Sequence, residues 1–177
     1  GRQRDVTVIA ARRLQLKDRL NKLQSCGLAV DAVQGDSFAL HNYLVYAHGP
    51  ADDDAAPAPP VAAFDVGCDT ATLVVAAPGA PWSRSVGFGA DKLGKVLVRQ
   101  FNLTLAQAEA WKRNPALAPS VHKLYEAVDD VLGDLSEELQ RALEAYRAAN
   151  PGRDVAEVRA LGGGLQFHGL LRRLQGG

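Results

Sequence analysis

Three short apolar runs joined by tight turns constrain the fold of this chain more than any other feature. Val61–Val66 and Leu73–Ala77 flank the polar turn Gly67–Thr70, and a second turn, Pro78–Pro81, leads to a third run at Trp82–Phe88. Runs rich in apolar and β-branched residues favour strands, and connections this short join antiparallel neighbours. The sequence therefore predicts an antiparallel three-stranded meander.

Amphipathic patterns predict helices after the meander. Apolar residues recur at helical spacing over Asp91–Phe101, over Thr104–Trp111, where Thr104 can act as the cap, and from Ser120 to Ala149. The last stretch is long, with Gly133 as a candidate kink, and Asn150–Gly152 ends it. A helix of ~30 residues would extend ~45 Å.

Weaker patterns predict the remaining elements. Residues 48–60 are rich in proline and aspartate and contain no large apolar side chain, which indicates a flexible, solvated loop. The other expected elements are, in chain order, a strand at Val6–Ala10, a helix through Leu16 and Leu23 that stops at Gly27, a strand at Leu28–Val33, a helix capped by Asp36 or Ser37, a strand at Val155–Leu161 and a helix at Leu165–Leu174.

Composition excludes several classes of protein. The 20 Lys and Arg residues balance the 20 Asp and Glu residues, so no basic excess favours nucleic-acid binding. No run approaches the ~20 apolar residues of a membrane span, and none resembles a signal peptide. Cys26 and Cys68 lie far apart and are interpreted as reduced thiols of a cytosolic protein. The four histidines show no metal-ligand spacing.

One segment imitates a phosphate-binding loop. Gly89–Val96 nearly matches GxxxxGK[ST], but Val96 stands where the motif needs a hydroxyl. Leu93, Leu97 and their neighbours also form an apolar helical face that passes through Gly94 and Lys95. We therefore interpret this segment as a helix without a phosphate role.

Two other segments favour nucleotide chemistry. In the first, Asp65 ends an apolar strand and Gly67 opens a hydroxyl-rich turn, where backbone N–H groups can approach phosphate and the carboxylate can orient hydrated Mg²⁺. In the second, Gly162–Gly164 join a strand to a helix, and such a junction attracts anions and accepts a flat base or ribose. Each pattern is also ordinary turn chemistry, so neither is decisive alone.

Taken together and in this order, the two segments resemble the actin-like ATPase superfamily, with Asp65 opening its second phosphate motif and Leu161–Gly164 its adenosine motif. Other segments resemble the PilM family, which helps to assemble bacterial type IV pili. They are Ala10–Arg12, Cys26–Leu28, Phe38–Leu40, Trp82–Asp91, Ala106–Lys112 and Glu138–Tyr146. The resemblance covers nearly the whole chain, whose two ends look cut, and we interpret it as a fragment.

The resemblance implies an α/β, actin-like (ribonuclease H-like) fold with mixed sheets flanked by helices. Residues 1–47 would belong to the first lobe with the partner-binding subdomain, 48–60 to a flexible loop, and 61–177 to the second lobe, with a helical subdomain at about 91–149. The implied cofactors are ATP and Mg²⁺. Asp65, Gly67, Asp69 and Thr70 would face phosphate, with Asp65 towards the metal, and Gly162, Gly163 and Gly164 would face the adenosine.

The resemblance also implies a partner and a location. The partner would be the cytosolic tail of a PilN-like inner-membrane protein, which would hold this cytoplasmic protein peripherally at the membrane without insertion. No nucleic-acid partner is implied, and self-association stays open. The activity expected is at most that of a weak ATPase.

Two alternatives remain at the level of sequence. Ala71, where the family often has Thr, and Leu161, where it has a small polar residue, favour a scaffold that has kept the fold and lost nucleotide. A sugar or acetate-type kinase of the same superfamily would need a catalytic Asp outside this sequence.

Overall fold

A four-stranded mixed sheet forms the centre of the molecule. The computed structural model describes residue 8 and residues 10–48, 59–76 and 81–175 of the 177-residue chain. The strands are β1 (Val61–Val66), β2 (Ala71–Ala76), β3 (Trp82–Val86) and β4 (Glu157–Leu161), in the order β3-β2-β1-β4. The first three pair antiparallel, whereas β4 pairs parallel to β1. The expected meander is confirmed.

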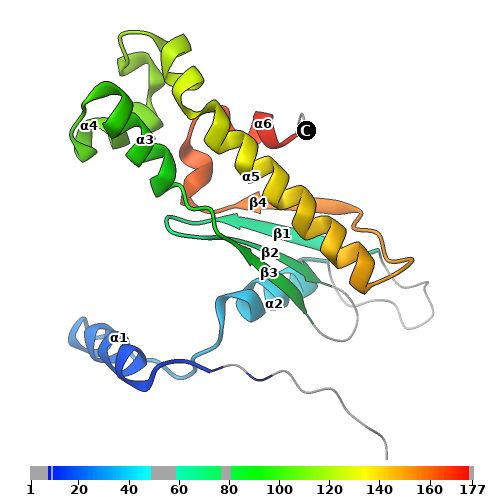
Figure 1. Cartoon of the computed structure of the whole chain (residues 1–177). Coiled ribbons are helices and arrows are strands. Elements are labelled where there is room, and N and C mark those ends of the chain that lie inside the picture. Colours follow the sequence, from blue (N-terminus) through cyan, green and yellow to red (C-terminus); the bar gives the residue numbers. More distant parts are fainter. Residues whose placement is uncertain (1–7, 9, 49–58, 77–80, 176–177) are drawn as a thin grey trace, which may run out of the picture.

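Helices cover both faces of this sheet (Figure 1). They are α2 (Asp36–His48) on one face and α5 (Val121–Ala149) across the other, with α3 (Asp91–Phe101), α4 (Leu105–Arg113) and the short helix η1 (Pro115–Leu117) beyond one end of the sheet. The sequence predicted α3 with these bounds, and α5 runs unbroken through Gly133. The expected Thr104 cap is confirmed, because its hydroxyl accepts a hydrogen bond from the amide of Gln107 while the Gln107 side chain accepts one from the Thr104 amide.

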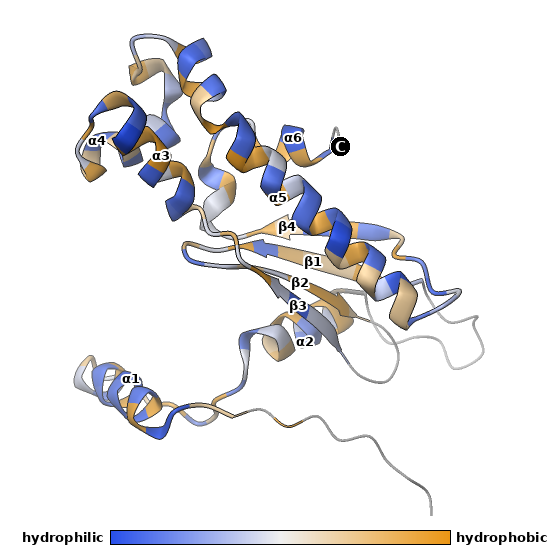
Figure 2. Ribbon diagram, in the orientation of Figure 1, coloured by the Kyte–Doolittle hydropathy of each residue, from blue (hydrophilic) through white to orange (hydrophobic). Residues whose placement is uncertain are grey.

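Strand alternation divides the core in two. Ala62, Phe64 and Val66 of β1 are buried on the face that α5 covers. Val61 and Ala63 point the opposite way and pack on Leu44 of α2. Fully burying a side chain such as Leu44 stabilises a fold by about 1.5–3 kcal/mol, so α2 is anchored to the sheet. Figure 2 shows that hydrophobic and hydrophilic residues alternate along α5, as expected for a helix with one face on the sheet.

The N-terminal part differs from the expectation. Helix α1 (Arg13–Ser25) ends before Gly27 as predicted, but no residue of Leu28–Val33 lies in a strand, so that prediction was wrong. Leu28 and Val33 are exposed, and a strand forms only where a neighbouring strand satisfies its hydrogen bonds. Of the strand expected at Val6–Ala10, Val8 and Ala10 are described and have no regular structure, and the other three residues lie outside the described part. Most of the expected loop at residues 48–60 lies outside it too.

The C-terminal helix is interrupted. Instead of one helix at Leu165–Leu174, the chain forms the short helix η2 (Gly163–Gln166) and then α6 (Leu170–Gln175). Gly169 between them has φ +86°, a left-handed conformation that a continuous helix cannot contain. The chain therefore does not continue as one helix. Phe167 and Gly169, at this interruption, line two different cavities, which are described below. None of the helices in the described residues combines the length and the hydropathy that a membrane crossing requires.

Candidate functional site

The two predicted motifs meet at one end of the sheet. Asp65 pairs in register with Thr72 of β2 on one side and with Leu161 of β4 on the other. The turn after β1 and the glycine turn after β4 therefore begin next to each other (Figure 1). Parallel pairing of β1 with β4 is what brings together two segments almost a hundred residues apart in sequence.

The turn after β1 is held in place by its neighbours. The amide of Gly67 donates to the carbonyl oxygen of Thr70 at 3.0 Å, which closes the turn. The carbonyl oxygens of Gly67 and Cys68 accept hydrogen bonds from the amides of Ala90 and Asp91, each at 3.0 Å. The turn is thus tied to the start of α3, while Asp69, Thr70 and the Cys68 thiol are left exposed.

The glycine turn after β4 packs directly on β1. Gly162 has φ +101°, and a Cβ there would lie 2.3 Å from Oδ1 of Asp65 and 2.5 Å from the carbonyl oxygen of Val66. Gly164 is buried, and a Cβ there would lie 2.4 Å from Cγ1 of Val66. A Cβ at Gly163, by contrast, would meet no atom within 4 Å. Two of the three glycines are therefore needed for packing, and the middle one faces open space.

Asp65 faces a second carboxylate. Strand alternation turns it to the α2 side of the sheet, where it is half-buried. Burial raises the pKa of Asp65, and the negative charge of Asp36, the first residue of α2, raises it further. Sequence analysis treated Asp36 only as a helix cap, and no local pattern connects it with Asp65, because the packing of α2 brings them together.

A cavity of about 270 Å³ lies on the other side of the glycine turn. Its polar wall comes from α4, where Nζ of Lys112 lies 2.8 Å from Oε1 of Glu109. Lys112 is 9% exposed and is the one buried charged side chain among the described residues. The lining residues are Cys68, Ala90, Glu109, Lys112, Arg113, Gly163, Gly164, Gln166 and Phe167.

The structure thus divides the predicted site residues into two groups. Gly163 and Gly164 line the cavity, whereas Asp65, Gly67, Asp69 and Thr70 do not, and Gly162 packs between the two groups. Sequence analysis missed Glu109, Lys112 and Arg113 as cavity residues. Glu109 and Lys112 lie in Ala106–Lys112, a segment that the sequence analysis uses only for the family resemblance. The signal that could have found them is a Glu–Lys pair three residues apart on one helix face.

A magnesium nucleotide, which the sequence resemblance implies, would meet the following groups at this place. The cavity offers backbone, an aromatic ring and cationic side chains to a base and ribose, and the neighbouring turn presents the exposed residues Cys68, Asp69 and Thr70 to phosphates. The charge of Asp36 raises the pKa of Asp65, and a divalent cation near the two carboxylates would relieve this repulsion. The described residues contain no group of three or more His, Cys, Asp or Glu side chains suited to a metal, so phosphate and water would supply the other ligands.

The glycine and lysine of the P-loop-like segment are not part of the site. Both lie inside α3, and the ammonium group of Lys95 pairs with Asp91 one turn earlier. Ala71 is fully buried in the core on the α5 side and Thr72 contacts Ser85 across β2 and β3, so neither faces the turn.

A larger cavity of about 590 Å³ lies between α5 and α6 and shares no residue with this site.

Comparison with known proteins agrees with the sequence resemblance. The sequence profile of the family described as type IV pilus assembly protein PilM matches residues 1–176. A search of the curated proteins finds no match.

Solved structures confirm the expected actin-like ATPase fold. A chain of the PilM-PilN type IV pilus biogenesis complex matches with a TM-score of 0.71 and 25% identity, over 93% of the present chain and 46% of that chain. The present chain therefore spans less than half of that protein. Two more distant structures share the fold. One is the ethanolamine utilization protein EutJ from Carboxydothermus hydrogenoformans, with a TM-score of 0.54 and 16% identity, over 66% of the present chain and 41% of that one. The other is MreB5 of Spiroplasma citri bound to ADP, with a TM-score of 0.59 and 13% identity, over 90% of the present chain and 56% of that one.

Proposed function

Because the chain belongs to the family of the type IV pilus assembly protein PilM, we propose that it is part of the ATP-binding component of a pilus assembly platform. The observation that carries this proposal is the contact between the Gly162 turn and Asp65, with a cavity on one side of the turn and the carboxylate of Asp65, which is influenced by the charge of Asp36, on the other. The base and ribose of a nucleotide would complement the cavity, and its magnesium ion would complement the carboxylate of Asp65.

Each part of the site has a distinct role in this proposal. The cavity beside Gly163 holds the base and ribose, with Lys112 and Arg113 as the nearby cations. Exposed backbone of the Gly67–Thr70 turn meets phosphate oxygens, and Asp65 with Asp36 orients the hydrated metal. When bound, the metal neutralises phosphate charge. The chain's own contribution is to fix the carboxylates and the turn before binding.

The sequence places residues 1–47 with the first lobe, but Leu44 of α2 is fully buried against Val61 and Ala63 of β1. We therefore propose that the chain up to the end of α1 belongs to the first lobe and that α2 belongs with residues 61–177 in the second. Helix α1 supports this division, because none of its residues is buried and Leu14 is 82% exposed. Figure 1 shows α1 standing apart from the sheet. Leu23, Leu28 and Val33 of the same region are exposed as well, and apolar surface of this extent is expected to pack against further protein. The matched chain of the PilM-PilN complex has more than half of its length outside the match.

We further propose that the longer protein docks a PilN-like inner-membrane protein and that nucleotide biases this assembly. The support is the related structure, in which PilM is solved together with PilN. Co-purification of the longer protein with such a partner, with and without Mg-ATP, tests the proposal. An unchanged yield in the two conditions would contradict coupling to nucleotide.

Calorimetric titration of Mg-ATP tests the nucleotide site itself. With one lobe missing, phosphates would meet protein on one side only, so we expect this chain to bind no more tightly than about millimolar, roughly −4 kcal/mol. A longer protein that contains the first lobe should bind more tightly, and Asp65→Asn should weaken that binding at least tenfold. Asp134→Asn, an exposed carboxylate of α5, is the matched control and should leave the affinity unchanged.

The same titration separates this proposal from a nucleotide-free scaffold. The missing hydroxyl at Ala71 favours the scaffold at the level of sequence, but the side chain is fully buried in the core, so a hydroxyl there would not reach the turn. Absence of any heat of binding in the longer protein would support the scaffold. Micromolar binding by the present chain alone would show that the site is elsewhere.

A further inference from the structure

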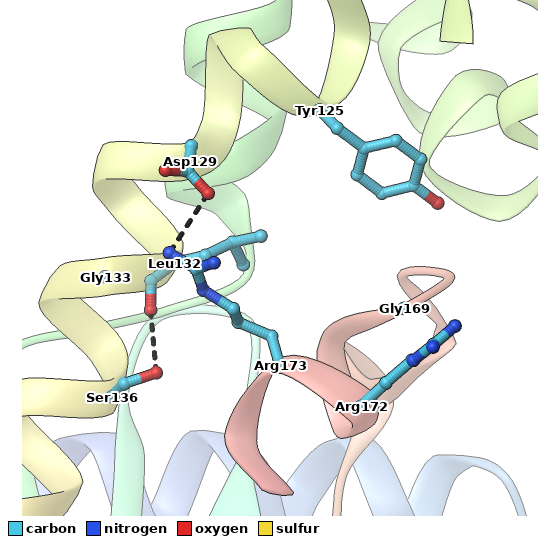
Figure 3. Close-up of a pocket in the computed structure, with 8 residues that line it drawn as sticks. All are labelled: Tyr125, Asp129, Leu132, Gly133, Ser136, Gly169, Arg172 and Arg173. Atoms are coloured by element: carbon cyan, nitrogen blue, oxygen red, sulfur yellow. Dashed lines mark hydrogen bonds and ion pairs between the residues drawn. The ribbon is translucent and has the colours of Figure 1, made fainter. Parts of the chain in front are cut away.

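The cavity between α5 and α6 is lined by both apolar and charged side chains (Figure 3). Its volume of about 590 Å³ falls within the range of about 300–1,000 Å³ that is usual for small-molecule sites. Leu132, which is 5% exposed, and the ring of Tyr125 supply apolar surface from α5. Arg172 and Arg173 of α6 supply charge.

A glycine in the middle of α5 keeps one wall of this cavity bare. Gly133 lies within a 29-residue helix, where glycine costs about 1 kcal/mol relative to alanine. The α5 helix continues through this position, and a Cβ here would meet no atom within 4 Å. Close packing therefore does not require the glycine. Its structural effect is to leave room beside Leu132 and Ser136, which also line the cavity.

The aromatic wall is held in one position. The hydroxyl of Tyr125 donates to the carbonyl oxygen of His168 at 3.0 Å. The ring also meets the ring of Phe167 edge-on, with centroids 5.8 Å apart. Because both contacts restrain Tyr125, a ligand that stacks on its free face would lose little side-chain entropy from the protein.

The charges of the lining leave one cation uncompensated. Nη2 of Arg173 lies 3.1 Å from Oδ1 of Asp129, so these two charges neutralise each other. Arg172 is exposed and has neither an ion pair nor a hydrogen bond to any residue in the described ranges. Figure 3 shows Arg173 reaching towards Asp129 and Arg172 reaching to the side where Gly169 and Tyr125 lie. A guanidinium beside apolar surface suits one anionic group on an apolar body.

We propose that this cavity binds a small organic monoanion with a flat apolar body, of the aromatic carboxylate or sulfonate class. The body lies between Tyr125 and Leu132 over Gly133, and the anionic group meets Arg172. Polyphosphates are disfavoured, because a single unpaired cation cannot balance several charges. The proposal is independent of the nucleotide site, with which the cavity shares no residue.

Titration of the whole chain with naphthalene-2-sulfonate, followed by amide NMR, tests the proposal. We expect saturable shifts at the amides of Gly133, Ser136 and Gly169. Naphthalene-2-methanol, which lacks the charge, and sulfate, which lacks the apolar body, should each bind at least tenfold more weakly. Shifts spread over the exposed residues of α1, or equal affinity for the neutral compound, would overturn the proposal.

Two variants locate the site. Arg172→Ala should weaken binding at least tenfold, whereas Arg153→Ala, which removes an exposed arginine outside the cavity, should have no effect. Gly133→Leu should fill the cavity and abolish binding without lowering the melting temperature, because leucine favours helix and meets open space. Ala148→Leu is its control on an exposed position of the same helix. Wild-type affinity in Gly133→Leu or Arg172→Ala would refute the assignment.

Discussion

Replacing Gly162 by alanine should destabilise the chain strongly, although the change adds only one methyl group. The position has φ +101° and ψ 159°, a conformation that is essentially restricted to glycine and costs other residues about 1–3 kcal/mol. The new Cβ would also lie 2.5 Å from the carbonyl oxygen of Val66, which is backbone and cannot rotate away. Backbone shifts that relieve such a contact cost a further ~1–3 kcal/mol.

The expected loss of unfolding free energy is therefore about 3 kcal/mol. For a chain of this size, that corresponds to a drop in melting temperature of about 6–12 °C. Urea unfolding followed by circular dichroism measures it, with the slope of free energy against urea unchanged if the folded state keeps its compactness.

Gly163→Ala is the matched control in the neighbouring residue. Its Cβ would meet no atom within 4 Å and its φ is not left-handed, so stability should change by less than about 0.5 kcal/mol. Similar stability losses in the two variants would refute the reasoning, because they would mean that the turn after β4 does not pack on β1 as described.

Two further predictions concern charged residues. The raised pKa of Asp65 means that folding favours its protonated form, so this carboxyl should lower stability as pH rises from its ordinary value near 3.8 through the raised value, and no further above it. Asp36→Asn removes one cause of the shift, and urea unfolding between pH 3 and 7 should show a smaller loss; an unchanged pH profile would mean that the two carboxylates do not interact. Lys95→Ala should leave the Mg-ATP affinity of the longer protein intact, because Lys95 sits in α3 and pairs with Asp91, and a tenfold loss, about 1.4 kcal/mol, would restore the P-loop interpretation.

Local sequence determined the elements whose hydrogen bonds and caps are local. The helix Asp91–Phe101 and the strand Val61–Val66 have the predicted bounds, and Thr104 caps α4 as expected. The order of motifs along the chain was also sufficient to identify the family and the actin-like fold, and the comparisons confirm both. These features depend on periodicity, turn chemistry and motif order, all of which can be read along a single chain.

Tertiary structure decided what depends on a distant partner. Leu28–Val33 has a strand-like composition but no neighbouring strand within the described part of the chain, and a φ of +86° at Gly169 divides the last helix where the sequence pattern continues. The influence of Asp36 on Asp65 arises only when α2 packs on the sheet, and the burial of Lys112 beside the glycine turn arises only when α4 packs on α3. Such contacts join residues far apart in sequence, and their energy depends on positions in space that no local pattern specifies.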